Sequence, residues 1–281
     1  MLENTTSATA PSGKITTLDL PAADGGSIHC ISAGSGPTVV LAHGFLLDVT
    51  SYQPIFDQLV QRGYRVVAFD QRGHGGSRDG SAGSGPAAAV SDYHVVLEHF
   101  GTEGATLVGH SMGGFLGLLF CLQYPEQMRR LRRLVLLGAN AGGVAHGSMS
   151  NKIQMPLLEI GLLPKLWRVP GLGRALMKPL FGQKQDPAWL ELTRKMLISQ
   201  DLPRTLTLMR AMNHENYYDK LGAITVEARV VCGQLDRTCP SWHSERLSKE
   251  LPNARGRWLP GIGHMLGYEA PDEIIRAITE A

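Results

Sequence analysis

Ser111 lies at the centre of Gly109-His110-Ser111-Met112-Gly113, a stretch whose residue types and spacing suit nucleophilic catalysis. A short strand-like apolar run at 105–108 precedes it, and an apolar run with helical length at 115–122 follows it. A strand, a tight turn and a helix would leave the serine hydroxyl exposed and the next amide free at a helix N-terminus. Flanking glycines let strand and helix approach without side-chain clashes. This G-x-S-x-G pattern predicts a nucleophile elbow.

A serine hydroxyl needs a base within hydrogen-bond reach, and the base needs a group that holds its tautomer. Among the histidines that follow Ser111, His264 alone follows a predicted strand and lies in a Gly-rich loop, so we predict it to be the base. We predict Asp236 to be the acid, because it closes a turn just after the strand that ends at Cys232. The rival carboxylates lie in a long insertion: Asp186, Asp201 and Asp219.

Acyl transfer also needs two donors aimed at the developing oxyanion. The backbone amide of Met112, the residue after the nucleophile, is the first candidate. The second is the backbone amide of Phe45, in the loop after the predicted strand 38–42, where His43-Gly44 favours a tight backbone. We therefore predict an oxyanion hole formed by Phe45 and Met112.

These residues must be positioned by strands and helices that alternate along the chain. Hydrophobic periodicity and Gly or Pro boundaries predict a hairpin at 14–33 and strands at 38–42, 64–69, 105–108, 134–137, 228–232 and 255–259. The same signals predict helices at 51–62, before Phe100, after Ser111, at 240–251 and at 271–280. Such alternation predicts an α/β fold with a mostly parallel central sheet flanked by helices.

Residues 143–222 interrupt this alternation, because they contain no strand-like run and are divided into short helical segments by prolines. We predict a helical cap insertion there, a core made of residues 14–142 and 223–281, and a flexible tail at 1–13. The cap is rich in Leu and Met, which could form a roof over a hydrophobic substrate or simply pack the cap onto the core. The predicted substrate-binding residues are His43, His110, Trp167 and Met212.

Composition excludes several function classes. A net charge of +2 favours no polyanion partner, so we expect no nucleic-acid binding, and we interpret Arg129–Arg133 as the solvated end of a helix. No apolar run is long enough to span a membrane, and residues 1–13 lack the apolar segment of a signal peptide. We therefore expect a cytoplasmic protein without stable membrane insertion, with reduced cysteines, no metal site and no cofactor.

Five motifs together resemble the α/β-hydrolase superfamily, in particular its serine-nucleophile members with a helical cap. They are His43-Gly44-Phe45, Asp70-Gln-Arg72-Gly73-His74-Gly75-Gly76-Ser77, Gly109-His-Ser111-Met-Gly113-Gly114, Gly233-Gln-Leu-Asp236 and Gly263-His264. The resemblance implies the α/β-hydrolase fold, a cap at the position of the insertion, and a mainly structural role for the loop 70–77. A serine at the nucleophile position argues against the epoxide hydrolases and haloalkane dehalogenases of this superfamily, which use aspartate.

The main functional hypothesis is a serine esterase that cleaves carboxylic esters of a small or medium hydrophobic substrate through an acyl-enzyme on Ser111. One alternative is hydrolysis of a carbon–carbon bond or a lactone by the same triad. A second alternative is a small-molecule receptor with little turnover. In each case the partner is a small molecule, and the sequence leaves the natural substrate and the oligomeric state open.

Overall fold

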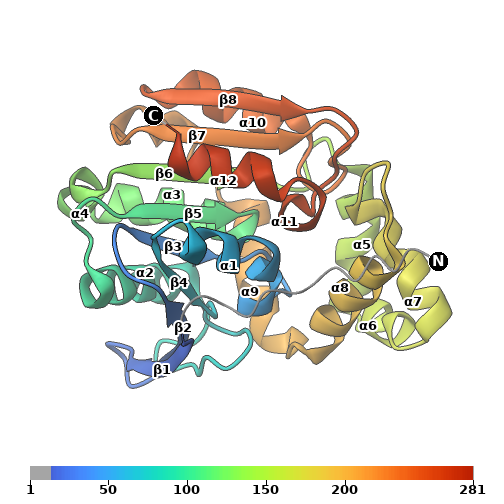
Figure 1. The fold of residues 1–281 in the computed structure, drawn as a ribbon. Coiled ribbons are helices and arrows are strands. Elements are labelled where there is room, and N and C mark those ends of the chain that lie inside the picture. The colour runs from blue at the N-terminus through green and yellow to red at the C-terminus, as the bar shows by residue number, and fades with distance from the viewer. Residues whose placement is uncertain (1–13, 281) are drawn as a thin grey trace, which may run out of the picture.

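The central sheet has eight strands in the order β1-β2-β4-β3-β5-β6-β7-β8 (Figure 1). The structure, a computed structural model, describes residues 14–280, so the expected tail at 1–13 lies outside the described residues. The strands are β1 (Thr16–Pro21), β2 (Ser27–Ala33), β3 (Thr38–Ala42), β4 (Arg65–Phe69), β5 (Thr106–His110), β6 (Arg133–Leu137), β7 (Ala228–Gly233) and β8 (Ala254–Leu259). β1 pairs antiparallel with β2, and β2 with β4, whereas the other pairs are parallel. The predicted hairpin and mostly parallel sheet are confirmed.

Helices cover both faces of this sheet (Figure 1). The core helices are η1 (Val49–Tyr52), α1 (Gln53–Gln61), α2 (Pro86–Phe100), α3 (Met112–Gln123), α4 (Pro125–Arg130), α10 (Ser241–Glu250), α11 (Leu266–Glu269) and α12 (Pro271–Thr279). α1 and α12 pack together on one face, and α2 and α3 pack together on the other. Since both faces are covered, the strands read as continuous apolar runs: Val39 and Leu41 of β3 enter one buried cluster, and Val40 and Ala42 enter the other.

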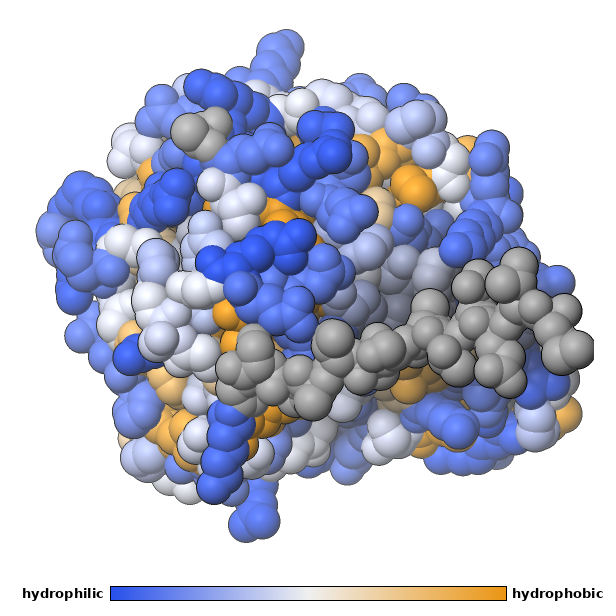
Figure 2. Space-filling model, in the orientation of Figure 1, coloured by the Kyte–Doolittle hydropathy of each residue, from blue (hydrophilic) through white to orange (hydrophobic). Residues whose placement is uncertain are grey.

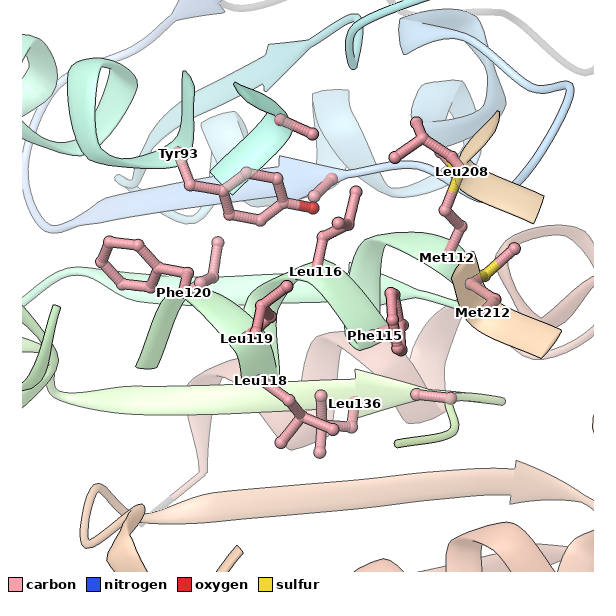
Figure 3. Close-up of a cluster of buried hydrophobic side chains, with 14 of the residues drawn as sticks. Tyr93, Met112, Phe115, Leu116, Leu118, Leu119, Phe120, Leu136, Leu208 and Met212 are labelled. Carbon is pink, nitrogen blue, oxygen red and sulfur yellow. The ribbon is translucent and has the colours of Figure 1, made fainter. Parts of the chain in front are cut away.

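Helix α3, which follows Ser111, is apolar on all sides because protein surrounds it on all sides. Figure 3 shows it between the sheet, the aromatic ring of Tyr93 from α2, and a helix that carries Leu208 and Met212. Phe115 and Leu116 are fully buried in this cluster. Burial of large apolar side chains contributes roughly 1.5–3 kcal/mol for each, so the position of the helix that begins at the nucleophile is strongly determined. The outer surface in the view of Figure 2 is mostly hydrophilic, with scattered hydrophobic residues.

The order of the strands reverses between β3 and β5, which are neighbours in the sheet although they are not consecutive in the chain. Ala42, the last residue of β3, is the register partner of Gly109, one residue before the end of β5. In open α/β sheets, ligands bind outside such a reversal point, at the carboxyl ends of the strands. The loop that begins at His43 and the turn at Ser111 both start there.

Between β6 and β7, the described chain forms helices, which we call the cap. They are α5 (Met149–Glu159), α6 (Leu162–Trp167), α7 (Pro170–Met177), η2 (Lys178–Leu180), α8 (Pro187–Ser199), α9 (Leu202–His214) and η3 (Tyr218–Ala223). α9 contacts α3, and α5 to α8 lie at the side of the molecule where the strands end (Figure 1). Across residues 14–280, no helix combines the length and apolar character needed to cross a bilayer.

The arginine-rich segment 129–133 differs from the expected solvated helix end at its last residue. Arg129, Arg130 and Arg132 are exposed, but Arg133 is only 1% exposed. Its guanidinium donates to the carbonyls of Ala277, Ile278 and Glu280, which close the C-terminus of α12, and it pairs with Glu227 at 3.0 Å. A buried cation is stabilised there by helix-end carbonyls and a carboxylate, so Arg133 joins the last helix to the sheet.

Candidate active site

Ser111 adopts a backbone conformation that side chains rarely take, with φ of 52° and ψ of −112°. It directly follows β5 and immediately precedes α3. The tight packing around it requires glycine: a Cβ on Gly113 would lie 2.1 Å from the carbonyl oxygen of Ala42, and one on Gly109 would lie 2.5 Å from that of Gly113. The glycines of the pattern thus permit the sharp strand-to-helix turn, because a side chain at either position would clash with the backbone.

His264 and Asp236 lie side by side although they come from loops after different strands. The Nδ1 atom of His264 is 2.6 Å from Oδ2 of Asp236, and both residues are buried. The other carboxylate oxygen of Asp236 accepts hydrogen bonds from the amides of Thr238 and Cys239, which holds the carboxylate in place. This arrangement keeps the proton on Nδ1 and leaves Nε2 of the imidazole as an acceptor.

Gly138, directly after β6, is a residue that sequence reasoning missed. Its φ is +50°, and a Cβ there would lie 3.0 Å from Oδ2 of Asp236 and 3.3 Å from Nδ1 of His264. A side chain at this position would therefore push against the pair of residues. The sequence offers no sign of this contact, because the three residues meet only when β6, β7 and β8 are paired.

The two predicted oxyanion donors lie on loops with constrained backbones. In residues 14–280, Leu46 and Ser111 are the non-glycine residues with positive φ, at 57° and 52°, and each is next to one predicted donor. In the same range, neither the Phe45 nor the Met112 amide donates to a carbonyl of the surrounding loops. Strained backbone conformations of this kind are concentrated at functional sites. Both amides are therefore candidates to donate a hydrogen bond to a substrate oxygen.

Two buried histidines hold the Phe45 loop. Nε2 of His43 accepts from the amide of Gln71 at 2.9 Å, and Nε2 of His74 accepts from the amide of Leu46 at 3.1 Å. Burial, together with His43, lowers the pKa of His74 to about 3, so its ring is neutral and able to accept. His43, predicted to bind substrate, is fully buried and does not line the cavity beside Ser111, and its ring instead holds the loop.

One cavity joins the remaining predicted residues. Ser111, His264, His110 and Phe45 line it from the core, and Trp167 and Met212 line it from the cap. Asp236 lies behind His264, and the side chain of Met112 is fully buried in the core, so its amide stays the predicted donor. The rest of the lining is uncharged and mostly apolar: Gly44, Leu46, Leu47, Val144, Asn151, Gln154, Met155, Leu158, Leu176, Met177, Leu180, Leu197, Met209, Thr238 and Met265.

The cap also holds the loop that carries His264. The carbonyl of Leu180 accepts from the amide of His264 at 2.8 Å. The carboxylate of Glu269 accepts from the amide of Gly182 at 2.7 Å and from that of Gly263 at 3.1 Å, and burial raises its pKa. This part of the cap is therefore a component of the site rather than a separate cover. Sequence reasoning missed Glu269, because no local pattern reveals a contact between cap and loop.

His110, the residue before the nucleophile, is linked to the same loop. Its Nε2 lies 2.9 Å from the carbonyl oxygen of His264, to which it donates, and the two rings are 4.8 Å apart. Burial, followed by the effect of His264, lowers the pKa of His110 from its ordinary value of 6.5 to about 3. The folded state thus holds this ring neutral, whereas the unfolded chain protonates it below pH 6.5.

We expect this difference to make stability depend on pH. The unfolded state binds the extra proton between about pH 6.5 and 3, so the stabilising effect of neutral His110 is lost as pH falls through that range. Between pH 7 and pH 5 the loss from this group is about 2 kcal/mol in the free energy of unfolding. Urea denaturation of wild type and His110→Gln at both pH values measures it: the variant should lose about 2 kcal/mol less than wild type.

The exposed His99 supplies the matched control. The variant His99→Gln should show the same loss of stability between pH 7 and pH 5 as wild type. If His110→Gln and His99→Gln behave alike, the ring of His110 is not held neutral in the folded state.

The cysteine thiols and the possible metal ligands do not add a second reactive centre to the described residues. The four cysteines are free and buried, and burial raises the pKa of both Cys30 and Cys232 to about 12. Within the part of the chain that the structure describes, no three His, Cys, Asp or Glu side chains gather as ligands for a metal ion. The chemical capacity of this site lies in a serine, an imidazole, a carboxylate and two amides.

Comparison with known proteins identifies the family of this chain. A model of the alpha/beta hydrolase family matches residues 39–277. A 2-hydroxy-6-oxononadienedioate/2-hydroxy-6-oxononatrienedioate hydrolase of Comamonas testosteroni is 30% identical over 272 residues, which cover 89% of this chain and 88% of the relative.

A second relative and a solved structure extend this likeness. The 2-hydroxy-6-oxo-6-phenylhexa-2,4-dienoate hydrolase of Comamonas testosteroni is 30% identical over 265 residues, covering 89% of this chain and 88% of the relative. The solved structure of a thermophilic esterase from Thermogutta terrifontis matches with a TM-score of 0.76 at 25% identity, covering 94% of this chain and 97% of that one.

Proposed function

This chain belongs to the alpha/beta hydrolase family, and from that premise we propose that it is a serine hydrolase that cleaves the bond between a carbonyl carbon and its leaving atom. The observation that carries the proposal is the pairing of His264 with Asp236 at 2.6 Å, in a cavity that His264 shares with Ser111. Nucleophilic acyl transfer requires an exposed serine hydroxyl and a histidine whose ring proton is kept on the nitrogen that faces away from that hydroxyl.

The proposed reaction has two halves. Nε2 of His264 takes the proton of Ser111 as its oxygen bonds to the carbonyl carbon, and the amides of Phe45 and Met112 stabilise the oxyanion. The bond to the leaving atom then breaks, and the leaving atom takes the proton from His264. Water, deprotonated in turn by His264, attacks the acyl-enzyme, which releases an acid and restores Ser111.

The relatives support carbon–carbon bond hydrolysis better than the ester cleavage that the sequence placed first. Both curated relatives described above are named as hydrolases of 2-hydroxy-6-oxo dienoates. We therefore propose, as the first substrate class, ketones in which the bond between the carbonyl carbon and an activated carbon atom is broken after attack by Ser111.

The cavity favours an uncharged tail on that substrate. Its lining contains no Lys or Arg among the described residues, and a dioate substrate carries one carboxylate more than a dienoate with a phenyl tail. A buried carboxylate without a cation or a full set of donors is strongly disfavoured. This uncharged lining also supports the second candidate function, hydrolysis of a carboxylic ester with an apolar acyl group.

A two-substrate comparison tests both candidates on one preparation. We expect 2-hydroxy-6-oxo-6-phenylhexa-2,4-dienoate to be cleaved with a higher kcat/KM than its nonadienedioate counterpart, because the phenyl tail is uncharged. A series of nitrophenyl esters from acetate to octanoate is measured in parallel. Cleavage of esters alone would favour the second candidate, and tight binding of either class without repeated turnover would contradict the hydrolase proposal and favour a receptor.

A further inference from the structure

Helices α5 to α7 and the residues beside them carry most of the exposed large apolar side chains. Six of the eight large hydrophobic residues that are exposed in the described part of the chain lie between positions 149 and 172. They are Met149, Ile153, Ile160, Leu162, Val169 and Leu172. Met149 and Ile153 are one helical turn apart on α5, and Ile160 is the C-cap residue of the same helix. We call these six residues the cap face.

The segment that carries the cap face is rich in positive charge. Residues 149–184 contain six Lys or Arg and one Glu, a net charge of +5 in a chain whose overall net charge is +2. All six cations are exposed: Lys152, Lys165, Arg168, Arg174, Lys178 and Lys184. Among residues 14–280, Arg174 is the one of these six that pairs with a carboxylate, that of Glu191 at 3.5 Å.

A groove beside this face leads toward the catalytic cavity. It is lined by Ile160 of the cap face, by the cations Lys165 and Arg168, and by the carboxylates of Glu159 and Asp201. Four side chains line both the groove and the cavity: Leu46, Leu158, Trp167 and Leu197. All four are buried, so they form an apolar partition between the groove and the space above Ser111.

We propose that the cap face docks on the surface of a lipid bilayer that contains anionic phospholipids. The apolar side chains of the cap face enter the headgroup region while the cations of the same segment contact lipid phosphates, which is how interfacial amphipathic segments bind. A second copy of this chain suits the face less well, because two surfaces of the same positive charge repel. In Figure 2, hydrophobic and hydrophilic residues lie side by side at the lower right, the side on which Figure 1 places the cap helices.

Docking in this orientation brings the groove to the lipid surface. An apolar substrate dissolved in the bilayer then reaches Ser111 when the partition side chains move, without crossing water. This entry route rests on the proposed function, but the docking itself does not.

Sedimentation with vesicles of phosphatidylcholine, with and without phosphatidylglycerol, tests the docking. We expect wild type to bind the vesicles that contain phosphatidylglycerol, less so in high salt because salt screens surface charge. The double variants Met149→Ser/Ile153→Ser and Lys152→Glu/Lys178→Glu should each lower the vesicle partition coefficient by about tenfold or more. Neither variant touches the cavity lining.

Matched controls come from exposed residues outside the cap. Ile15→Ser and Lys249→Glu remove an exposed apolar side chain and an exposed cation, and should leave vesicle binding unchanged. Thermal unfolding of each variant verifies folding. Absence of wild-type binding, or equal binding by the cap-face variants, would overturn the proposal. So would a dimer, seen by analytical ultracentrifugation, that the cap-face variants dissociate. Vesicle binding needs no turnover, so this outcome is independent of the proposed hydrolase function.

Discussion

Replacing Ser111 with alanine should lower kcat by about 10⁶-fold, because the proposed covalent intermediate forms on its hydroxyl. The residual rate would come from binding and from the amides of Phe45 and Met112, which the substitution leaves in place. The measurement is turnover of the best substrate from the two-substrate comparison. A fluorophosphonate probe, which bonds to activated serines, should label wild type at Ser111 and leave the variant unlabelled.

Ser244 provides the matched control for this substitution. It is fully buried, and its hydroxyl has no hydrogen-bond partner among the described residues. Ser244→Ala should keep wild-type turnover and labelling. Turnover by purified Ser111→Ala that matches wild type would end the proposal that this serine is the nucleophile.

Replacing Asp236 with asparagine should lower kcat by about 10⁴-fold with little change in KM. The carboxylate holds the proton on Nδ1 of His264 from 2.6 Å and stabilises the imidazolium that forms when Ser111 is deprotonated. The side-chain amide of asparagine would donate a hydrogen bond to Nδ1 of His264. The proton of the imidazole would then lie on Nε2, the atom that must accept the proton of Ser111. The variant should also react more slowly with the fluorophosphonate probe, which reports activation of Ser111 without a substrate.

The cap residue Asp201 is one of the rival acids in the sequence, and Asp201→Asn is the control. It should keep wild-type kcat and labelling rate, because Asp201 lies in the cap beside α9 rather than next to His264. Equal loss in the two variants would mean that the contact between Asp236 and His264 does not activate the serine.

The sequence by itself determined the elements of the core and the order of the candidate residues along them. The strands at 38–42 and 134–137, the turn at Ser111 and the helix after it were predictable because each depends on local signals. Those signals are apolar runs, glycines that permit close backbone approach, and prolines that open helices. The structure confirms these elements at nearly the predicted boundaries.

Only the tertiary structure decided which side chains meet. His43 and His110 have equal claims in the sequence, yet the first is enclosed behind the Phe45 loop and the second lines the cavity. Arg133, expected in solvent, is buried against the end of α12.

The same holds for the contacts of Gly138 and Glu269 and for the uncharged lining of the cavity. Each joins residues distant in the chain, whose separation is set by strand pairing and by the packing of the cap. No short-range propensity encodes such distances, because they arise when the whole sheet closes and its helices bury their apolar faces.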